Sequence, residues 1–324
     1  MDENQIIAAI RKAFNTSPGR DRGFYDDAVF INDGKGFSVL KADMFVASTD
    51  MPPGMNLRQA SRKAVISTLS DLASKGAEAL YFVVSMGIPR RINNDRSVQL
   101  IIEGLKQASK QYNIRLVGGD VNESRDFVID VIGFGRATKS AARSGARPGD
   151  LVIATGSFGY TGLGLSHLLR GLRLPDELRK DCLTSVYEPS PNFDIARSIV
   201  ASGIAKASMD SSDGLAMTLH EIAEQSGVAI EIYSLPMDDK IEKLGGGVLD
   251  RRILQEAVLY GGEEFHTVIT LPKELYQQAE DIASSKNGRL YRIGEVVKGE
   301  GVFLTADGGK SWTRIRKRGW VHLT

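Results

Sequence analysis

Residues 116–120, Leu-Val-Gly-Gly-Asp, predict a buried strand that ends in two glycines and an aspartate. Glycine lets backbone N–H groups approach a ligand closely, and an aspartate beside them is a hard oxygen ligand that suits Mg²⁺. For an isolated Gly-Gly-Asp, a strand followed by a tight turn is the favoured interpretation. The chain repeats this arrangement of strand end, glycine and acid at several places, so a site for phosphate and metal becomes a hypothesis worth testing.

The composition is that of an ordinary globular chain. Its 324 residues exceed the usual size of one hydrophobic core, so two domains are expected. The 41 basic and 40 acidic residues nearly cancel, so neither nucleic acid nor a membrane is predicted as a partner. The single cysteine, Cys182, excludes a disulfide framework and a cysteine-based metal site. With no signal-peptide pattern and no apolar run of ~20 residues, we expect a soluble cytoplasmic protein.

Apolar periodicity and turn residues predict the elements of the first half. Helices are expected over 3–14, from a cap at Asn56 to Lys75, and from a cap at Asn93 or Asn94 to Tyr112; strands are expected over 26–31, 37–50, 80–88, 114–118 and 127–135. The strand 80–88 is expected to be buried on both faces, and 127–135 to be the antiparallel neighbour of 114–118. Asp71 points away from the apolar stripe of its helix, on the face of Ser67 and Ser74, where a solvated acid is favoured.

A basic, turn-rich segment over 138–150 is predicted to link two domains, residues 1–137 and 151–324. The second half is expected to contain strands over 151–155, 204–209, 228–233, 265–271, 291–297 and 301–305, and helices to about 170, over 175–187, 192–201, 215–225 and 273–286, and one ending near 259. These elements indicate an α+β fold in each half.

Familiar signatures of nucleotide and catalytic sites are weak in this chain. Gly309-Lys310-Ser311 resembles the end of a P-loop, but the first glycine of that motif would fall at Leu304, and a hairpin turn is the better interpretation. The glycines at 156, 159, 162 and 164 do not have the G-x-G-x-x-G spacing of a dinucleotide loop. No G-x-S-x-G elbow is present, and the four histidines have no metal-ligand spacing.

What remains is a set of acids at loop and strand positions. If several converge, cations must offset their mutual repulsion, and a purely oxygen ligand set indicates Mg²⁺ or Mn²⁺. About half of such a set would ordinarily be surface acids. The set consists of Asp27, Asp43, Asp50, Asp71, Asp120, Asp210, Asp213 and Glu263.

Several motifs occur together in one order: Asp26-Asp27-Ala28, Ser70-Asp71-Leu72-Ala73, Gly118-Gly119-Asp120, Asp210-Ser211-Ser212-Asp213-Gly214-Leu215 and Gly261-Gly262-Glu263. In this order they resemble the thiamine-monophosphate kinase family, part of the superfamily of aminoimidazole ribonucleotide synthetase and selenophosphate synthetase. The run at 143–150 resembles the family's linker, and Gly319-Trp320-Val321-His322 resembles its C-terminal ending. The resemblance covers nearly the whole chain.

The resemblance implies a two-domain α+β, synthetase-like fold. Two subunits would pair their N-terminal sheets into a barrel as a homodimer, and the C-terminal domain would be an α/β sandwich. The implied reaction is direct, in-line transfer of the ATP γ-phosphoryl group to thiamine phosphate with several Mg²⁺ ions and no catalytic side chain. By motif position, the implied metal ligands are Asp27, Asp43, Asp71, Asp120, Asp210 and Asp213; the ATP contacts are Gly119, Asp120, Arg143 and Ser212; and the substrate contacts are Asp50, Glu263 and Trp320.

Departures from the family pattern concern the substrate contacts. Asp50 stands where the family carries a substrate-contacting histidine, and Gly-Gly-Glu continues as Glu264-Phe265-His266. Ala42 stands where the residue before Asp43 is often threonine. Two alternatives stay open: another ATP-using enzyme of the superfamily, such as an aminoimidazole ribonucleotide synthetase, and a non-catalytic nucleotide sensor. The Gly-Trp ending disfavours the first alternative, and the retention of all six candidate metal acids disfavours the second.

Overall fold

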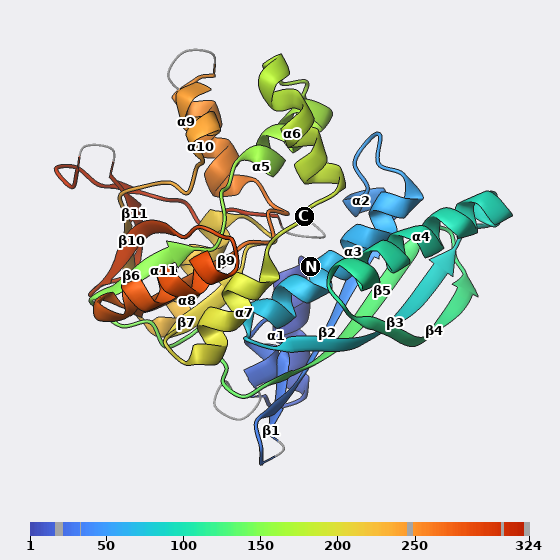
Figure 1. Ribbon diagram of the computed structural model, residues 1–324, viewed down its shortest axis with the longest axis horizontal. Coiled ribbons are helices and arrows are strands. Elements are labelled where there is room, and N and C mark those ends of the chain that lie inside the picture. Colours follow the sequence, from blue (N-terminus) through green and yellow to red (C-terminus); the bar gives the residue numbers. More distant parts are fainter. Residues whose placement is uncertain (17–21, 33, 245–248, 306–307, 321–324) are drawn as a thin grey trace.

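The computed structural model describes residues 1–324 except 17–21, 33, 245–248, 306–307 and 321–324. Two helix-covered sheets lie on either side of a buried helix, α3 (Leu57–Ser74), which contacts both halves of the chain (Figure 1). No helix in the described ranges is both long enough and apolar enough to span a membrane.

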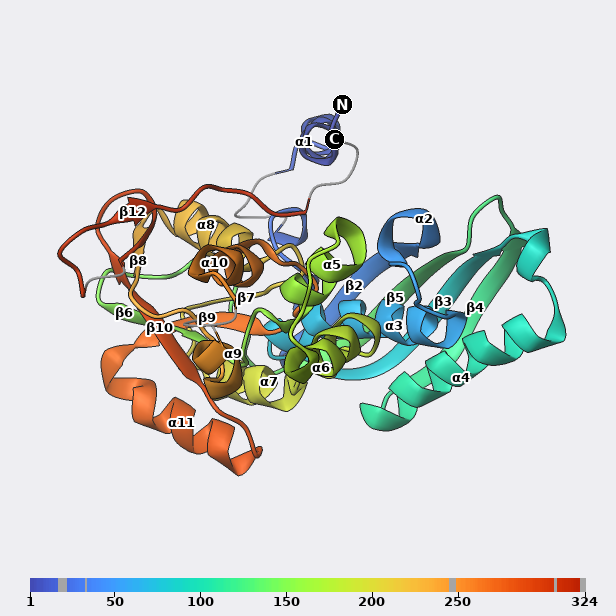
Figure 2. The ribbon, with the colours of Figure 1, turned by 90° about the horizontal axis from the view of Figure 1, so that it is seen from above.

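The first sheet has five strands in the order β1-β2-β5-β3-β4. All neighbouring pairs are antiparallel except β3 and β4, which run parallel and are connected through α4. α3 and α4 pack together against one face of this sheet (Figure 2). The elements of this half are α1 Glu3–Ala13, β1 Val29–Asn32, β2 Phe37–Val46, α2 Ala47–Asp50, β3 Glu78–Ile88, α4 Asp95–Gln111, β4 Arg115–Glu123 and β5 Val128–Ala137.

The capping residues and apolar spacing predicted both long helices, α3 and α4, correctly. The side chain of Asn56 accepts the N–H of Gln59, whose own side chain accepts the N–H of Asn56. The side chain of Asn94 caps α4 by accepting the N–H of Ser97. A cap of this kind stabilises a helix by about 1 kcal/mol, and the predicted caps are confirmed.

The edge of this sheet differs from the prediction. β4 is the last strand, and all nine of its residues are exposed, so the prediction of a buried strand over 114–118 is wrong. β5 pairs with β2 and β3 and not with β4, so the predicted pairing of 127–135 with 114–118 is also wrong. β3 is mostly half-exposed, because the helices of this chain cover only one face of the sheet.

The second sheet has seven strands in the order β12-β11-β8-β10-β6-β9-β7, antiparallel except for the β11–β8 pair. Most predicted elements are confirmed, while α9 was not anticipated. The elements are β6 Asp150–Ala154, α5 Tyr160–Arg170, α6 Asp176–Tyr187, α7 Phe193–Ser202, β7 Ala207–Asp210, α8 Leu215–Ser226, β8 Ala229–Ile232, α9 Asp239–Leu244, α10 Arg251–Tyr260, β9 Thr267–Pro272, α11 Tyr276–Ser285, β10 Tyr291–Val297, β11 Gly301–Leu304 and β12 Thr313–Arg314.

Helices cover both faces of the second sheet, and β6 shows the alternation that this requires. Val152 and Ala154 pack in the core beneath α8, whereas Ile153 packs with residues of α7 and α11 on the opposite face. All five residues of β6 are buried. The second half is thus an α/β sandwich, with α5, α6, α9 and α10 forming a further helical cluster beside it.

Candidate active site

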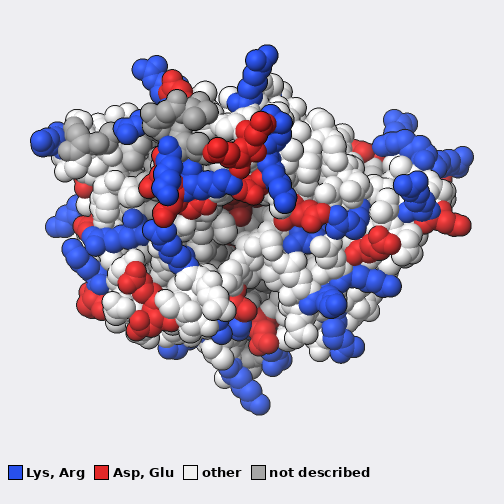
Figure 3. Space-filling view, turned by 45° about the horizontal axis from the view of Figure 1, so that its top comes forward, with Lys and Arg blue, Asp and Glu red and all other residues white. Residues whose placement is uncertain are grey.

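Three acids from distant parts of the chain meet at the junction of the two halves. Asp27 precedes β1, Asp71 lies in α3, and Asp210 ends β7. All three are buried, and their carboxylate oxygens lie within 4.8 Å of one another. They are the only such group of metal-capable side chains among the described residues. Figure 3 shows acidic and basic side chains gathered around a recess on one face of the molecule.

One face of α3 organises these acids. Ser67, Ser70 and Ser74 recur at helical spacing around Asp71, and each hydroxyl donates to an acid from another segment. Ser70 Oγ donates to Asp210 at 2.8 Å, Ser74 Oγ donates to Asp27 at 3.3 Å, and Ser67 Oγ donates to Asp43 of β2. The prediction that Asp71 shares a face with Ser67 and Ser74 is confirmed. Its interpretation as a solvated acid is wrong, because that face packs against the other acids.

Three cations lie against the same acids. Lys41 Nζ lies 2.8 Å from Asp71 Oδ2. Arg143 contacts Asp27 Oδ1 through Nη2 at 2.5 Å and Nε at 2.6 Å. Lys75, whose side chain is fully buried, contacts Asp26 at 2.7 Å and Asp27 at 2.6 Å.

Lys75 also ties the two halves together. Its ammonium donates to the backbone carbonyl of Ser208 in β7, while its acid partners belong to the N-terminal half. In return, Ser208 Oγ donates to the carbonyl of Ser74 at 2.7 Å. Because Ser208 and Asp210 lie on the same strand, β7, the contacts of Lys75 fix the position of Asp27 relative to Asp210.

The surroundings split the acids into two kinds. Burial opposes ionisation of Asp27, but Arg143 and Lys75 outweigh it and lower the pKa of Asp27 to about 2. Burial and the charge of Asp210 raise the pKa of Asp71 well above its usual value. Burial and the charge of Asp27 likewise raise the pKa of Asp210. A further positive charge beside Asp71 and Asp210 would therefore lower their pKa values and favour their ionised forms.

The donor set fits Mg²⁺. It consists of carboxylate oxygens at close range, which is the chemistry that Mg²⁺ prefers, and a divalent cation would offset the repulsion that raises two of the pKa values. Within the described residues, Ser211 Oγ is buried without a hydrogen-bond partner directly beside Asp210 in the chain. Asp43 lies close enough that its charge contributes to the raised pKa of Asp71.

Asp120 and Asp213, also predicted as metal ligands, are not part of the three-acid group. Asp120 lies on the exposed edge strand β4, opposite Ser85 of β3. Gly119 has a structural reason to be glycine, because an added Cβ would lie 2.1 Å from the carbonyl oxygen of Val84. Asp213 lies in the loop before α8, where its carbonyl accepts the N–H of Trp320 at 3.1 Å.

The loop after β7 is held by the loop before β9. Glu263 N–H donates to Ser212 O at 2.6 Å, and Phe265 N–H donates to Ser211 O at 3.1 Å. Glu263 and Phe265 have φ of 64° and 56°, in the left-handed region that non-glycine residues rarely adopt. Such backbone strain clusters at ligand-binding sites, and here it is held by backbone hydrogen bonds between the two loops.

Lys63 of α3 brings two of the predicted substrate contacts together. Its ammonium pairs with the carboxylate of Glu263 and donates to the backbone carbonyl of Asp50 at 3.2 Å. The Asp50 carboxylate accepts the N–H of Val46 at 2.7 Å, so it holds the end of β2 in place. Trp320, the third predicted contact, is half exposed.

The backbone at the start of α5, directly after the glycine-rich loop at 156–159, is hydrogen-bonded to a buried carboxyl group. The buried carboxylate of Glu264 accepts N–H groups of Gly159 at 2.7 Å and Thr161 at 3.2 Å, at the start of α5. Burial raises the pKa of Glu264 to about 7 despite these hydrogen bonds. The helix terminus is thus satisfied by the protein itself, which agrees with the weak dinucleotide signal there.

Sequence reasoning missed four side chains of this site: Lys41, Lys63, Lys75 and Ser70. Two signals were present, since Ser70, Asp71 and Ser74 share one helix face and Lys41 lies two residues before Asp43 on the same face of β2. For Lys75, at the end of α3, local sequence offers no signal, because its partners lie in other segments.

Comparisons with known proteins match the whole chain. The family of AIR synthase related proteins matches with its N-terminal domain over residues 25–137 and with its C-terminal domain over residues 147–307. A thiamine-monophosphate kinase of Nitrosopumilus maritimus (strain SCM1) is 33% identical, covering 100% of this chain and 99% of that protein. One from Pyrococcus horikoshii is 31% identical, covering 100% and 96%.

The fold agrees with the same family. A solved structure of AaThiL complexed with AMPPCP and TMP has a TM-score of 0.84 at 26% identity, covering 99% of this chain and 97% of that chain. The chain belongs to the thiamine-monophosphate kinase family of AIR synthase related proteins.

Proposed function

We propose that this protein transfers the γ-phosphoryl group of ATP to the phosphate of thiamine phosphate, which yields ADP and thiamine diphosphate. The observation that carries the proposal is the buried group of Asp27, Asp71 and Asp210 at the junction of the two halves, in a chain of this family. AaThiL, a solved structure of similar fold, was complexed with AMPPCP and TMP, which supports a nucleotide and an acceptor as the two substrates.

The acids would hold Mg²⁺. Asp27, Asp71 and Asp210 form the centre, and we propose Asp43, Asp120 and Asp213 as further ligands around it. Bound Mg²⁺ supplies positive charge that neutralises and orients the phosphates. Arg143 and Lys75 keep Asp27 ionised, since they lower its pKa, and so they hold it in the form that binds a cation.

The acceptor needs no general base. Its phosphate is already anionic, so an acceptor oxygen attacks the γ-phosphorus in line as the bond to the β–γ bridging oxygen breaks. This agrees with His266, whose pKa is lowered to about 4 by loss of solvation around its half-buried ring. We propose that Gly119, Asp120, Arg143 and Ser212 contact ATP and that Asp50, Glu263 and Trp320 contact thiamine phosphate. A tryptophan ring suits a cationic thiazolium.

We further propose a homodimer in which two N-terminal sheets pair into a barrel. Its support is the unpaired edge of β4, where Leu116, Val117 and Val121 are 47%, 53% and 60% exposed. An exposed apolar edge strand is a ready template for another chain, and a second copy would cover it. We also propose that 138–150 links two domains and that the enzyme is cytoplasmic.

The test is incubation of the purified protein with Mg²⁺-ATP and thiamine phosphate, with products separated by chromatography. We expect ADP and thiamine diphosphate in equal amounts, and neither product in excess EDTA. Formation of ADP with an amidine precursor of aminoimidazole ribonucleotide, but not with thiamine phosphate, would instead indicate the synthetase alternative. ATP binding without turnover of either acceptor would indicate a sensor. Inversion at a chiral γ-phosphorus would support in-line transfer, and retention would exclude it.

A further inference from the structure

The last described residues form a C-terminal strap, defined here as residues 315–320. The strap runs along α8 in the opposite direction to that helix, from β12 towards the loop that holds Asp213 (Figure 2). Ile315 lies beside His220, Lys317 beside Glu221 and Glu224, and Trp320 beside Asp213. The strap therefore ends at the candidate active site.

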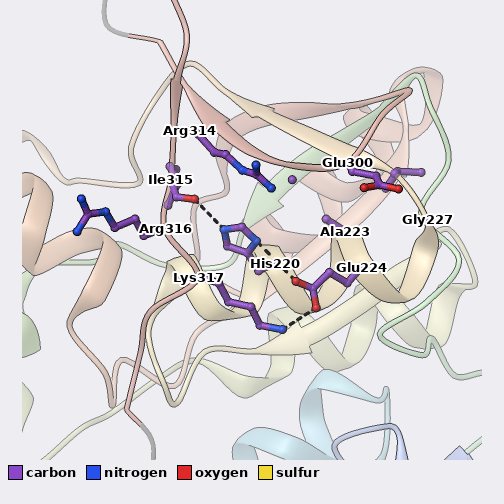
Figure 4. Close-up of a pocket in the computed structure, with 11 residues that line it drawn as sticks. His220, Ala223, Glu224, Gly227, Glu300, Arg314, Ile315, Arg316 and Lys317 are labelled. Carbon is purple, nitrogen blue, oxygen red and sulfur yellow. Dashed lines mark hydrogen bonds and ion pairs between the residues drawn. The ribbon is translucent and has the colours of Figure 1, made fainter.

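The first part of the strap is held by polar contacts over a hollow. A cavity of about 740 Å³ lies between α8 and the strap and is lined by His220, Glu224 and Lys317 among others (Figure 4). His220 Nε2 donates to the carbonyl of Ile315 at 3.0 Å, and Lys317 Nζ lies 2.6 Å from Glu224. Ile315 itself is buried and its N–H donates to Val302 O at 2.8 Å, so the polar contacts of Lys317 hold the part of the strap that follows it.

Lys317 also connects the strap to the acid group. Its ammonium lies 2.8 Å from Glu221 Oε1, and the other oxygen of that carboxylate lies 3.8 Å from Arg143 Nη1. Arg143 in turn holds Asp27. One line of alternating charges thus runs from the strap to the proposed metal centre.

The end of the strap is set by a close approach that only glycine allows. An added Cβ at Gly319 would lie 2.4 Å from Asp213 O and 3.0 Å from Met217 Cβ. Beside it, the Arg318 guanidinium pairs with Glu256 and lies 4.0 Å from the centre of the Tyr260 ring. Tyr260 ends α10, directly before the Gly261–Glu263 segment. The strap therefore contacts the loop that holds Asp213 and the end of the helix that leads into the segment with Glu263.

We propose that the strap is a clasp that positions Trp320 as a wall of the acceptor site, with Lys317 and Gly319 as its positioning residues. This rests on the proposed function, since it takes Trp320 as a contact to thiamine phosphate. Lys317 lies three residues before Trp320, so its ion pairs limit how far the ring can move along α8. Gly319 sets how close the ring comes to Asp213.

The test compares Lys317→Met and Gly319→Ala with Lys240→Met as a matched control. Lys240 lies on α9 and forms an exposed pair with Asp181 of α6 at 2.5 Å. All variants carry Trp312→Phe, so that Trp320 is the only tryptophan. We expect both strap variants to raise the KM for thiamine phosphate about tenfold and leave the KM for ATP within about threefold. The emission maximum of Trp320 should shift in both, and Lys317→Arg should restore it.

Two results would overturn the clasp. One is an unchanged Trp320 emission together with an unchanged KM for thiamine phosphate in both strap variants. The other is an equal rise in both KM values with a lowered melting temperature, which would indicate loss of structure alone. The fluorescence arm needs no turnover, so it tests the clasp even if the Trp312→Phe parent makes no thiamine diphosphate. Absence of that product would count against the proposed function and not against the clasp.

Discussion

Asp71→Asn is predicted to stabilise the metal-free protein while it abolishes turnover. The Asp71 carboxylate lies within 4.8 Å of those of Asp27 and Asp210 and is buried. Its pKa is raised by burial and by the charge of Asp210, so its ionised form costs folding free energy when no cation is bound. Asparagine keeps the shape of the side chain and removes the charge.

The magnitude follows from the distances. At an effective dielectric constant of about 20, each neighbouring acid, at no more than 4.8 Å, repels Asp71 by at least about 3 kcal/mol, and Lys41 at 2.8 Å attracts it by about 6 kcal/mol. The two repulsions and the one attraction nearly cancel. The cost of burying the charge of Asp71 therefore decides the sign of the change in the free energy of unfolding. We expect the free energy of unfolding to rise by about 1–3 kcal/mol at neutral pH.

The pH dependence has a definite sign. Below the ordinary carboxyl pKa of 3.8, Asp71 is protonated in the folded and unfolded chains, and the variant gains nothing. As the pH rises from there to the raised pKa, the wild type loses stability because its unfolded chain releases the proton first. Above the raised pKa, the difference in stability between wild type and variant is constant.

The assay is urea unfolding at neutral pH in EDTA and again in excess Mg²⁺, alongside product formation. Mg²⁺ should stabilise the wild type by binding only its folded state, and it should stabilise the variant less. Asp176→Asn, an exposed acid on α6 whose side chain is 88% exposed, is the control. The reasoning would be refuted if Asp71→Asn were more than about 1 kcal/mol less stable than the wild type in EDTA, or if it kept full turnover.

Three further predictions follow from single contacts. Lys75→Met should lower the free energy of unfolding by about 3–5 kcal/mol, because it removes the buried cation that Asp26 and Asp27 share and leaves Arg143 as the remaining cation in contact with Asp27. Lys240→Met is the control in urea unfolding, and equal stability of the two variants would contradict this prediction. The pKa of Glu264 is raised from 4.5 to about 7, so the wild type should lose about 3 kcal/mol of stability as the pH rises through that window. Glu264→Gln should not show this loss. Parallel profiles of stability against pH in the two proteins would exclude a role of Glu264 in the pH dependence. Val117→Lys on the edge of β4 should yield monomers in analytical ultracentrifugation, and a dimer as tight as the wild type would place the interface elsewhere.

Much of the fold was predictable because its signals are local. The capping residues Asn56 and Asn94 act within three residues of themselves, and the apolar spacing of α3 and α4 is read along a single helix. Strand neighbours are not local. β3 lies between β4 and β5 because a parallel crossover through α4 places β4 at the edge, and nothing within residues 114–135 records that pairing.

The candidate site likewise has some features that local sequence predicts and others that depend on distant segments. The motifs predicted which acids to consider, and the spacing of Ser67, Asp71 and Ser74 predicted a shared helix face. The solvent exposure of that face was wrongly predicted, because β7 arrives from more than a hundred residues away to cover it. The exposure of β4 was also wrongly predicted, because its apolar residues indicated burial whereas all nine residues of the strand are exposed.

By itself, the sequence determined the elements, the acids at their ends and the resemblance to a family, since each depends on neighbours along the chain. Only the tertiary structure decided that Asp27, Asp71 and Asp210 meet, and that Asp120 lies apart from this group on an exposed edge. It also decided which acids carry internal cations, with Lys75 and Arg143 on Asp27 and Lys41 on Asp71. The physical reason is that Coulomb interactions depend on distance in space, and packing alone brings these charges together.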